Sequence, residues 1–79
     1  MMNTMLQRDK TLVALGRNIA RFRTLRGLSQ DKLAEKADLD RTYLSGIERG
    51  LRNCGIKNVV RIAKTLGARV EELCNGIEA

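Results

Sequence analysis

Basic, hydroxyl and phenol side chains follow one another closely in the segment DRTYLSGIERGLRN, residues 40–53. Guanidinium groups donate hydrogen bonds, and hydroxyl and amide groups both donate and accept them, which suits these residues to recognising another molecule. Catalysis would need more, yet the chain has no histidine, no serine–lysine or paired-carboxylate constellation and no glycine-rich phosphate loop. The residue types therefore indicate a binding protein, and an enzyme is not expected.

The two cysteines, Cys54 and Cys74, are the remaining reactive side chains. They lie far apart and outside any CxxC pattern, and without histidine the sequence supports neither a zinc site nor a disulfide framework. We interpret both as partly buried small hydrophobic residues, with a redox role as the alternative. No metal and no cofactor are expected.

The net charge of +6 is unevenly distributed. Residues 1–27 and 41–64 each carry six basic and one acidic side chain, whereas residues 28–40 and 65–79 are each net acidic. Clustered arginine and lysine are typical of a phosphate-binding surface, although solvated helix faces can carry the same charge.

The longest early apolar run, Leu12–Leu15, is far shorter than the roughly 20 residues of a membrane-spanning helix. We expect a cytoplasmic protein with no membrane partner.

The spacing of apolar residues predicts five helices joined by short turns, within one all-α domain over residues 1–79. Residues 1–8 are expected to be a leader that frays at the end of this domain. Glycine or asparagine-glycine follows four of the helices as a C-terminal stop signal. The helices are expected from about residue 12 to Gly27, over 30–37, over 41–49 up to Gly50, over 56–66 up to Gly67, and over 70–74 before Asn75-Gly76.

Short polar residues mark the turns around the second and third helices. Ser29 is positioned to cap the second helix and Asp40 the third, because their side-chain oxygens can accept from free backbone N–H groups. Asp38 lies where the chain must turn, and aspartate is among the few non-glycine residues that tolerate a left-handed conformation. Between the caps, the second helix is expected to bury Leu33, Ala34 and Ala37.

The third helix has a glycine, Gly46, in its interior, at a cost of roughly 1 kcal/mol relative to alanine. At about 100° per residue, one arc is polar and is expected to face outward. Gly46 would lie on this arc, where its missing side chain lets another body approach or leaves room for arginine and tyrosine to reach around. The outward arc comprises Thr42, Ser45, Gly46 and Arg49; the inward arc comprises Leu44, Ile47, Glu48 and Leu51.

With these features the chain resembles the Cro/phage-repressor (Xre) family of helix-turn-helix DNA-binding domains, from about Leu12 to Gly76. Residues 30–49 are similar to the helix-turn-helix itself, with Ala34 where the two helices cross. The resemblance implies a compact five-helix, lambda-repressor-like DNA-binding domain. The sequence departs from the family at Asp38, where glycine is usual, and at Cys54-Gly55, where relatives often have a Pro-Ser helix start. The matching apolar core positions are Leu33, Ala37, Leu39, Leu44 and Ile47.

Within that family, residues 40–53 are similar to the controller proteins of restriction-modification systems. This resemblance implies a small homodimeric transcription factor that reads a palindromic operator near a promoter, often that of its own gene, with RNA polymerase as a candidate partner there. Two other interpretations stay open. One is an antitoxin-like module that binds a protein partner, and the other is a nucleoid-type binder without sequence preference.

The resemblance places the third helix in the DNA major groove, where base edges present distinct donor and acceptor patterns. Arg41 is the candidate for a bidentate contact to guanine, while Tyr43 is as readily explained by packing on the second helix. The segment after the helix would contact phosphates, as would the start of the second helix. Candidate base contacts are Arg41, Thr42, Tyr43, Ser45 and Gly46; candidate backbone contacts are Gln30, Arg49, Arg52, Asn53 and Lys57.

Glu48 is expected to point inward among aliphatic side chains, where an unpaired carboxylate would cost several kcal/mol. The family resemblance nominates Arg23 as its partner, in a structural ion pair.

A two-fold dimer would present two such domains to half-sites about one helical turn, roughly 34 Å, apart. The apolar residues near the C-terminal end, residues 68–79, could form its interface or could close the core of each chain: Val70, Leu73, Cys74 and Ile77.

Overall fold

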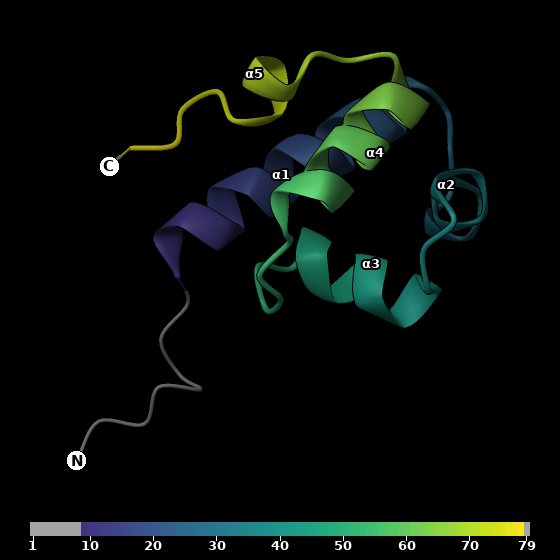
Figure 1. Ribbon diagram of the computed structural model, residues 1–79, viewed down its shortest axis with the longest axis horizontal. Helices are drawn as coiled ribbons and strands as arrows, with labels where there is room; N and C mark the ends of the chain where they lie inside the picture. The colour runs from purple at the N-terminus through teal and green to yellow at the C-terminus, as the bar shows by residue number, and fades with distance from the viewer. Residues whose placement is uncertain (1–8, 79) are drawn as a thin grey trace.

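The computed structural model describes residues 9–78 of the 79-residue chain. Five helices follow one another through this part of the chain, as the apolar periodicity predicts (Figure 1). The expected fraying of residues 1–8 lies outside the described residues. The helices are α1 (Lys10–Leu25), α2 (Gln30–Ala37), α3 (Arg41–Glu48), α4 (Ile56–Leu66) and α5 (Val70–Leu73).

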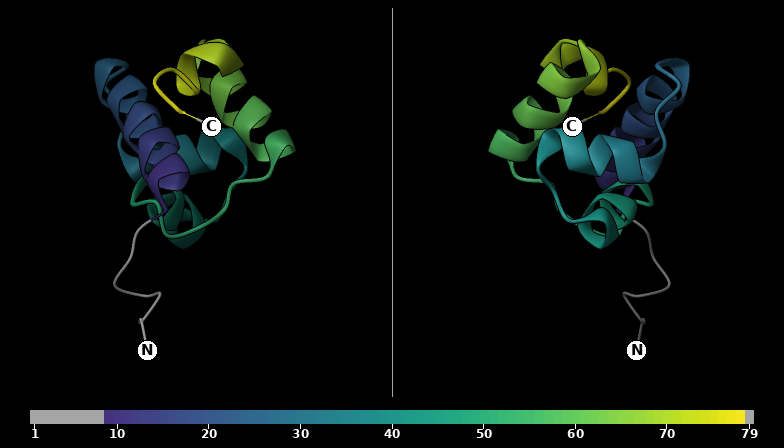
Figure 2. Two further views of the ribbon diagram at one scale, coloured as in Figure 1. Left: turned by 90° about the vertical axis from the view of Figure 1, so that its left-hand side faces the viewer. Right: turned by 90° about the vertical axis from the view of Figure 1, so that its right-hand side faces the viewer.

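α3 lies at one end of the molecule, and α5 lies at the opposite end in every view (Figures 1 and 2). α1 and α4 slope in the same direction in both views of Figure 2, and both extend from near α3 toward the end with α5. α3 packs against both α1 and α2, and α5 packs against α1 and α4. The largest fully buried side chains come from all five helices: Ile19, Leu33, Leu44, Ile47, Ile62 and Leu73.

The helix-turn-helix segment follows its sequence closely. Ser29 caps α2 by accepting from the N–H of Lys32 at 3.0 Å. Asp38 then adopts the left-handed conformation, with φ 56°, which allows its N–H to reach carbonyls of the last turn of α2. Asp40 caps α3 by accepting from the N–H of Tyr43 at 3.1 Å. Both predicted caps and the predicted turn are confirmed.

Several helix boundaries differ from the sequence-based expectation, among them the start of α1 and the end of α3. α1 begins at Lys10, before the first apolar residue, because the Asp9 carboxylate accepts from two free N–H groups at 2.9 and 3.2 Å. α3 ends at Glu48, and Gly50 takes a left-handed conformation with φ 74° that turns the chain away. Leu51 is therefore 51% exposed, and its expected place on the inward arc of the third helix is wrong.

The two cysteines have opposite environments. Cys54 is buried as part of the core, and burial raises the pKa of its thiol. Cys74 is exposed, because α5 ends at Leu73 and Cys74 is its C-cap. The expectation of partial burial is therefore wrong for Cys74.

Candidate nucleic-acid interface

The start of α3 is the part of the candidate interface that is most open to a partner. Asp40 fixes the first turn of the helix through its cap, and the next two side chains, Arg41 and Thr42, are exposed. Ser45, one turn further on, is partly exposed. A guanidinium and two hydroxyls at the leading end of a helix are donors that can reach base edges in a major groove.

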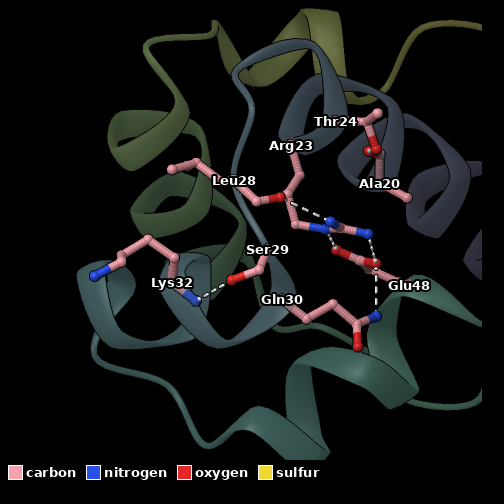
Figure 3. A network of polar contacts seen from close by, with 8 residues as sticks. All are labelled: Ala20, Arg23, Thr24, Leu28, Ser29, Gln30, Lys32 and Glu48. Carbon is pink, nitrogen blue, oxygen red and sulfur yellow. Dashed lines mark hydrogen bonds and ion pairs between the residues drawn. The ribbon is translucent and has the colours of Figure 1, made fainter.

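The opposite face of α3 is held by a polar network around Glu48 (Figure 3). The Glu48 side chain is 4% exposed, and Arg23 of α1 donates to its two oxygens from Nε at 2.7 Å and from Nη2 at 3.0 Å. Arg23 also donates to the carbonyl of Leu28 at 2.8 Å. The expected ion pair is confirmed, and it ties α3 to α1 and to the turn before α2.

Gln30 of α2 is the third member of this network (Figure 3). Its Nε2 donates to Oε1 of Glu48 at 2.8 Å, and the residue is only partly exposed. An amide nitrogen has two N–H groups, so at most one remains for a phosphate. The predicted phosphate contact of Gln30 is thus accompanied by a structural role that the sequence did not reveal.

Arg41 is paired across the helix-turn-helix. Its Nε lies 2.8 Å from Oδ1 of Asp31, in the first turn of α2, and both side chains are well exposed. Asp31 was not among the site residues predicted from the sequence, although an acidic residue near the start of α2 was a visible signal. The arginine that is the leading candidate for a base contact is therefore held by a carboxylate on the neighbouring helix.

Tyr43 packs against the core and is only partly exposed. Its hydroxyl oxygen accepts from Nδ2 of Asn58, in α4, at 3.3 Å. Tyr43 thus packs within its own chain. Its polar partner, Asn58 of α4, was not predicted from the sequence. A phenol that accepts one hydrogen bond keeps its own O–H for donation, so the candidate DNA contact remains a prediction.

Gly46 is buried, and its expected position on an exposed outer arc is wrong. The chain that leaves α3 folds back over it, with the N–H of Leu51 donating to the Gly46 carbonyl at 2.8 Å. A Cβ at Gly46 would lie 2.5 Å from Cγ of Arg52. The space left by the missing side chain is therefore filled by an arginine of the same chain.

The segment after α3 carries the candidate backbone contacts. All four of these residues are exposed, and Arg49 is the C-cap of α3. They follow α3 directly or lie in the first turn of α4, so their basic and amide groups can follow a phosphate strand beside that helix. The four residues are Arg49, Arg52, Asn53 and Lys57.

The C-terminal end differs from the expected interface. Leu73 is fully buried in the chain's own core, so the prediction that it contacts a partner chain is wrong. Val70 and Ile77 are partly buried against the same core, whereas Cys74 is exposed. The alternative interpretation, closure of the core of each chain, therefore holds for Leu73.

The described part of the chain contains no group of three or more histidine, cysteine, aspartate or glutamate side chains arranged to hold a metal ion. Over the same residues, 9–78, none of the helices has both the length and the apolar character needed to cross a membrane.

The fold, with the start of α3 exposed, is that of a helix-turn-helix DNA-binding regulator. The chain belongs to the helix-turn-helix family, whose family model matches residues 19–73. Within it, the chain is similar to the restriction-modification controller protein C.AhdI from Aeromonas hydrophila. That structure superposes with a TM-score of 0.77 at 42% identity, over 78% of this chain and 94% of the other.

Two relatives found by sequence are also control proteins. Control protein C.BamHI from Bacillus amyloliquefaciens is 50% identical over 46 residues, or 58% of this chain and 57% of that protein. Control protein C.MunI from Mycoplasma sp is 47% identical over 51 residues, or 65% of this chain and 69% of that protein. The chain thus spans a little over half of the first relative and about two thirds of the second. The biofilm regulator SinR in complex with DNA also superposes, with a TM-score of 0.72 at 37% identity over 75% of this chain and 95% of the other.

Proposed function

We propose that this protein is a homodimeric controller of a restriction-modification system that reads a palindromic operator with two copies of α3. The supporting observation is the asymmetry of α3. One face is fixed by the Glu48 network, and the leading end presents Arg41 and Thr42. A helix held rigidly with exposed donors at its N-terminal end is the arrangement that docks in a major groove.

The base contacts in this proposal come from α3 and the phosphate contacts from its surroundings. Arg41 donates to guanine O6 and N7, and the hydroxyls of Thr42 and Ser45 bond to base edges or phosphates. The exposed basic residues after α3, together with the remaining N–H of Gln30, position the domain on the backbone. Tyr43 contributes its free O–H, while Gly46 contributes only by admitting Arg52.

The proposed dimer follows from the small number of base pairs that one α3 can contact. Two half-sites about one helical turn apart, roughly 34 Å, require two copies related by a two-fold axis. Of the residues first considered for the interface, Cys74 and the exposed parts of Val70 and Ile77 remain available at the end with α5. The regulator would act in the cytoplasm on nucleoid DNA, near promoters that include its own, where RNA polymerase becomes a neighbour.

A selection from randomised duplexes with purified protein at physiological salt tests this function. We expect the enriched duplexes to share two inverted half-sites separated by about one helical turn. Arg41→Ala protein, taken through the same selection, should lose preference at one position of each half-site. Enrichment of no sequence would contradict the proposal and favour a binder without sequence preference, and a single half-site would contradict the dimer.

A further inference from the structure

Two carboxylates lie near the start of α3, and they have different tasks. Asp40 is committed to the helix, because its Oδ2 accepts from the N–H of Tyr43. Asp31 belongs to α2, and its Oδ1 lies 2.8 Å from Nε of Arg41. Asp31 is therefore the carboxylate that faces the guanidinium of Arg41.

The ion pair of Arg41 and Asp31 contributes little to the stability of the fold. The Arg41 side chain is 62% exposed and that of Asp31 is 77% exposed, and ion pairs this exposed contribute little to folding. The pair instead fixes where a long, flexible side chain points. A guanidinium has five N–H donors, and a contact through Nε leaves the two terminal nitrogens as a planar fork.

We propose that Asp31 is a specificity-determining residue that positions Arg41 for end-on reading of guanine. The inference rests on the proposed base contact of Arg41. With Nε held by Asp31, the fork of Nη1 and Nη2 can meet O6 and N7 of guanine without first being ordered. The same carboxylate competes with phosphates for the guanidinium, so it opposes binding of Arg41 to the backbone of unrelated DNA.

Asp31→Asn tests this role, because it keeps the size of the side chain and removes the charge. We expect discrimination at the base pair read by Arg41 to fall about two- to tenfold, the factor that corresponds to ordering one long side chain. Affinity for unrelated duplexes should rise at the same time. Asp31→Glu keeps the carboxylate and should restore part of the discrimination.

Glu35→Gln is the matched control. Glu35 is also an exposed carboxylate of α2 with a basic partner, Lys32, at 3.2 Å, but it does not contact Arg41. Removing its charge should raise the affinity for all duplexes by a similar factor and leave base discrimination unchanged. Thermal midpoints of both variants should match that of the wild type.

Affinities are measured by fluorescence anisotropy with three kinds of duplex. These are the selected operator, operators altered at the base position where Arg41→Ala loses its preference, and an unrelated duplex. In an Arg41→Ala background, Asp31→Asn should change discrimination no further. If Asp31→Asn raises affinity for all three duplexes equally, as Glu35→Gln does, the positioning role is overturned while the proposed function stands. A wild-type protein that enriches no operator overturns both.

Discussion

The Glu48 side chain is almost fully buried, and three hydrogen-bond donors contact its carboxylate oxygens. Arg23 supplies two of them and Gln30 the third. A buried charge pair of this kind contributes less to net stability than its short distances suggest, because both groups lose their hydration on folding. Its consequence is geometric, since it fixes how α3 is oriented against α1 and α2.

Removing one member of the pair should be far more harmful than removing both. Arg23→Ala leaves the carboxylate of Glu48 largely unpaired, and we expect a loss of about 3–5 kcal/mol in the free energy of unfolding. Arg23→Met combined with Glu48→Leu should recover most of this loss. Urea denaturation followed by circular dichroism measures both. Lys32→Ala, which breaks an exposed pair, should change stability by less than about 1 kcal/mol.

The basic residues of the interface should divide into two kinds by their effect on DNA affinity. Arg41→Ala should cost about 1–3 kcal/mol on the operator and relax one base position, because it removes a contact to a base edge. Lys57→Ala should weaken binding to all duplexes alike and reduce the salt dependence by about one counterion. Titrations at several salt concentrations distinguish the two. Equal losses on operator and unrelated DNA for Arg41→Ala would contradict the base contact.

At the scale of helices, α1 and α3 approach each other closely because Gly16 has no side chain. A Cβ at Gly16 would lie 2.5 Å from the Glu48 carbonyl oxygen and would also overlap that of Ile47. These are backbone atoms of α3, and they can move only if the whole helix moves. By contrast, the atoms nearest to a Cβ at Gly46 belong to the side chain of Arg52, with Cγ at 2.5 Å, and not to the backbone.

Alanine substitutions at these two glycines should therefore differ sharply. Gly16→Ala forces α1 away from α3, and we expect it to lose at least about 1–3 kcal/mol of stability, as overpacked cores do. Gly46→Ala forces the Arg52 side chain to rotate but gains up to about 1 kcal/mol in helix propensity, so its loss of stability should be smaller than that of Gly16→Ala. Thermal denaturation of the two variants compares them. A Gly16→Ala protein as stable as Gly46→Ala would contradict the close crossing.

Local signals in the sequence predicted the helices well, and contacts between helices were predicted poorly. Ser29, Asp38 and Asp40 determine caps and a turn within a few residues of themselves, so their roles were visible in the sequence. Gly46 was expected to be exposed because periodicity treats a helix as isolated, and it cannot show that Arg52 folds back over it. The importance of Gly16 depends on α3, a distant segment, and no local pattern revealed it.

In the candidate site, too, some contacts were predicted from the sequence, and those that depend on the packing of helices were not. The ion pair of Arg23 and Glu48 was predicted from the family resemblance together with the cost of a buried carboxylate. The pair of Arg41 and Asp31, in contrast, depends on the angle between α2 and α3, which spacing along the chain does not give. Leu73 was assigned to a dimer surface because a count of apolar residues does not show how much the core can bury.

At the scale of the whole molecule, α3, which we propose faces the DNA, and α5 lie at opposite ends (Figure 2). Leu73 of α5 is fully buried, so Leu73→Ala should lower the stability of each chain by about 2–5 kcal/mol. Cys74→Ser, at an exposed position, should leave that stability unchanged. Denaturation at several protein concentrations, with sedimentation equilibrium, separates chain stability from association. A Leu73→Ala protein that is fully stable but no longer associates would contradict this assignment.

Because Cys54 is buried, the rate at which a reagent labels its thiol reports how often the core opens. A thiol reacts as its thiolate, and Cys54 is both shielded and kept protonated by its raised pKa. In a Cys74→Ser protein, modification by a thiol reagent would therefore wait for the core to open. Under the proposed function, operator DNA binds the folded state alone and makes opening rarer by mass action. The labelling rate of this single thiol should consequently fall as the operator is occupied, without any dye on the DNA.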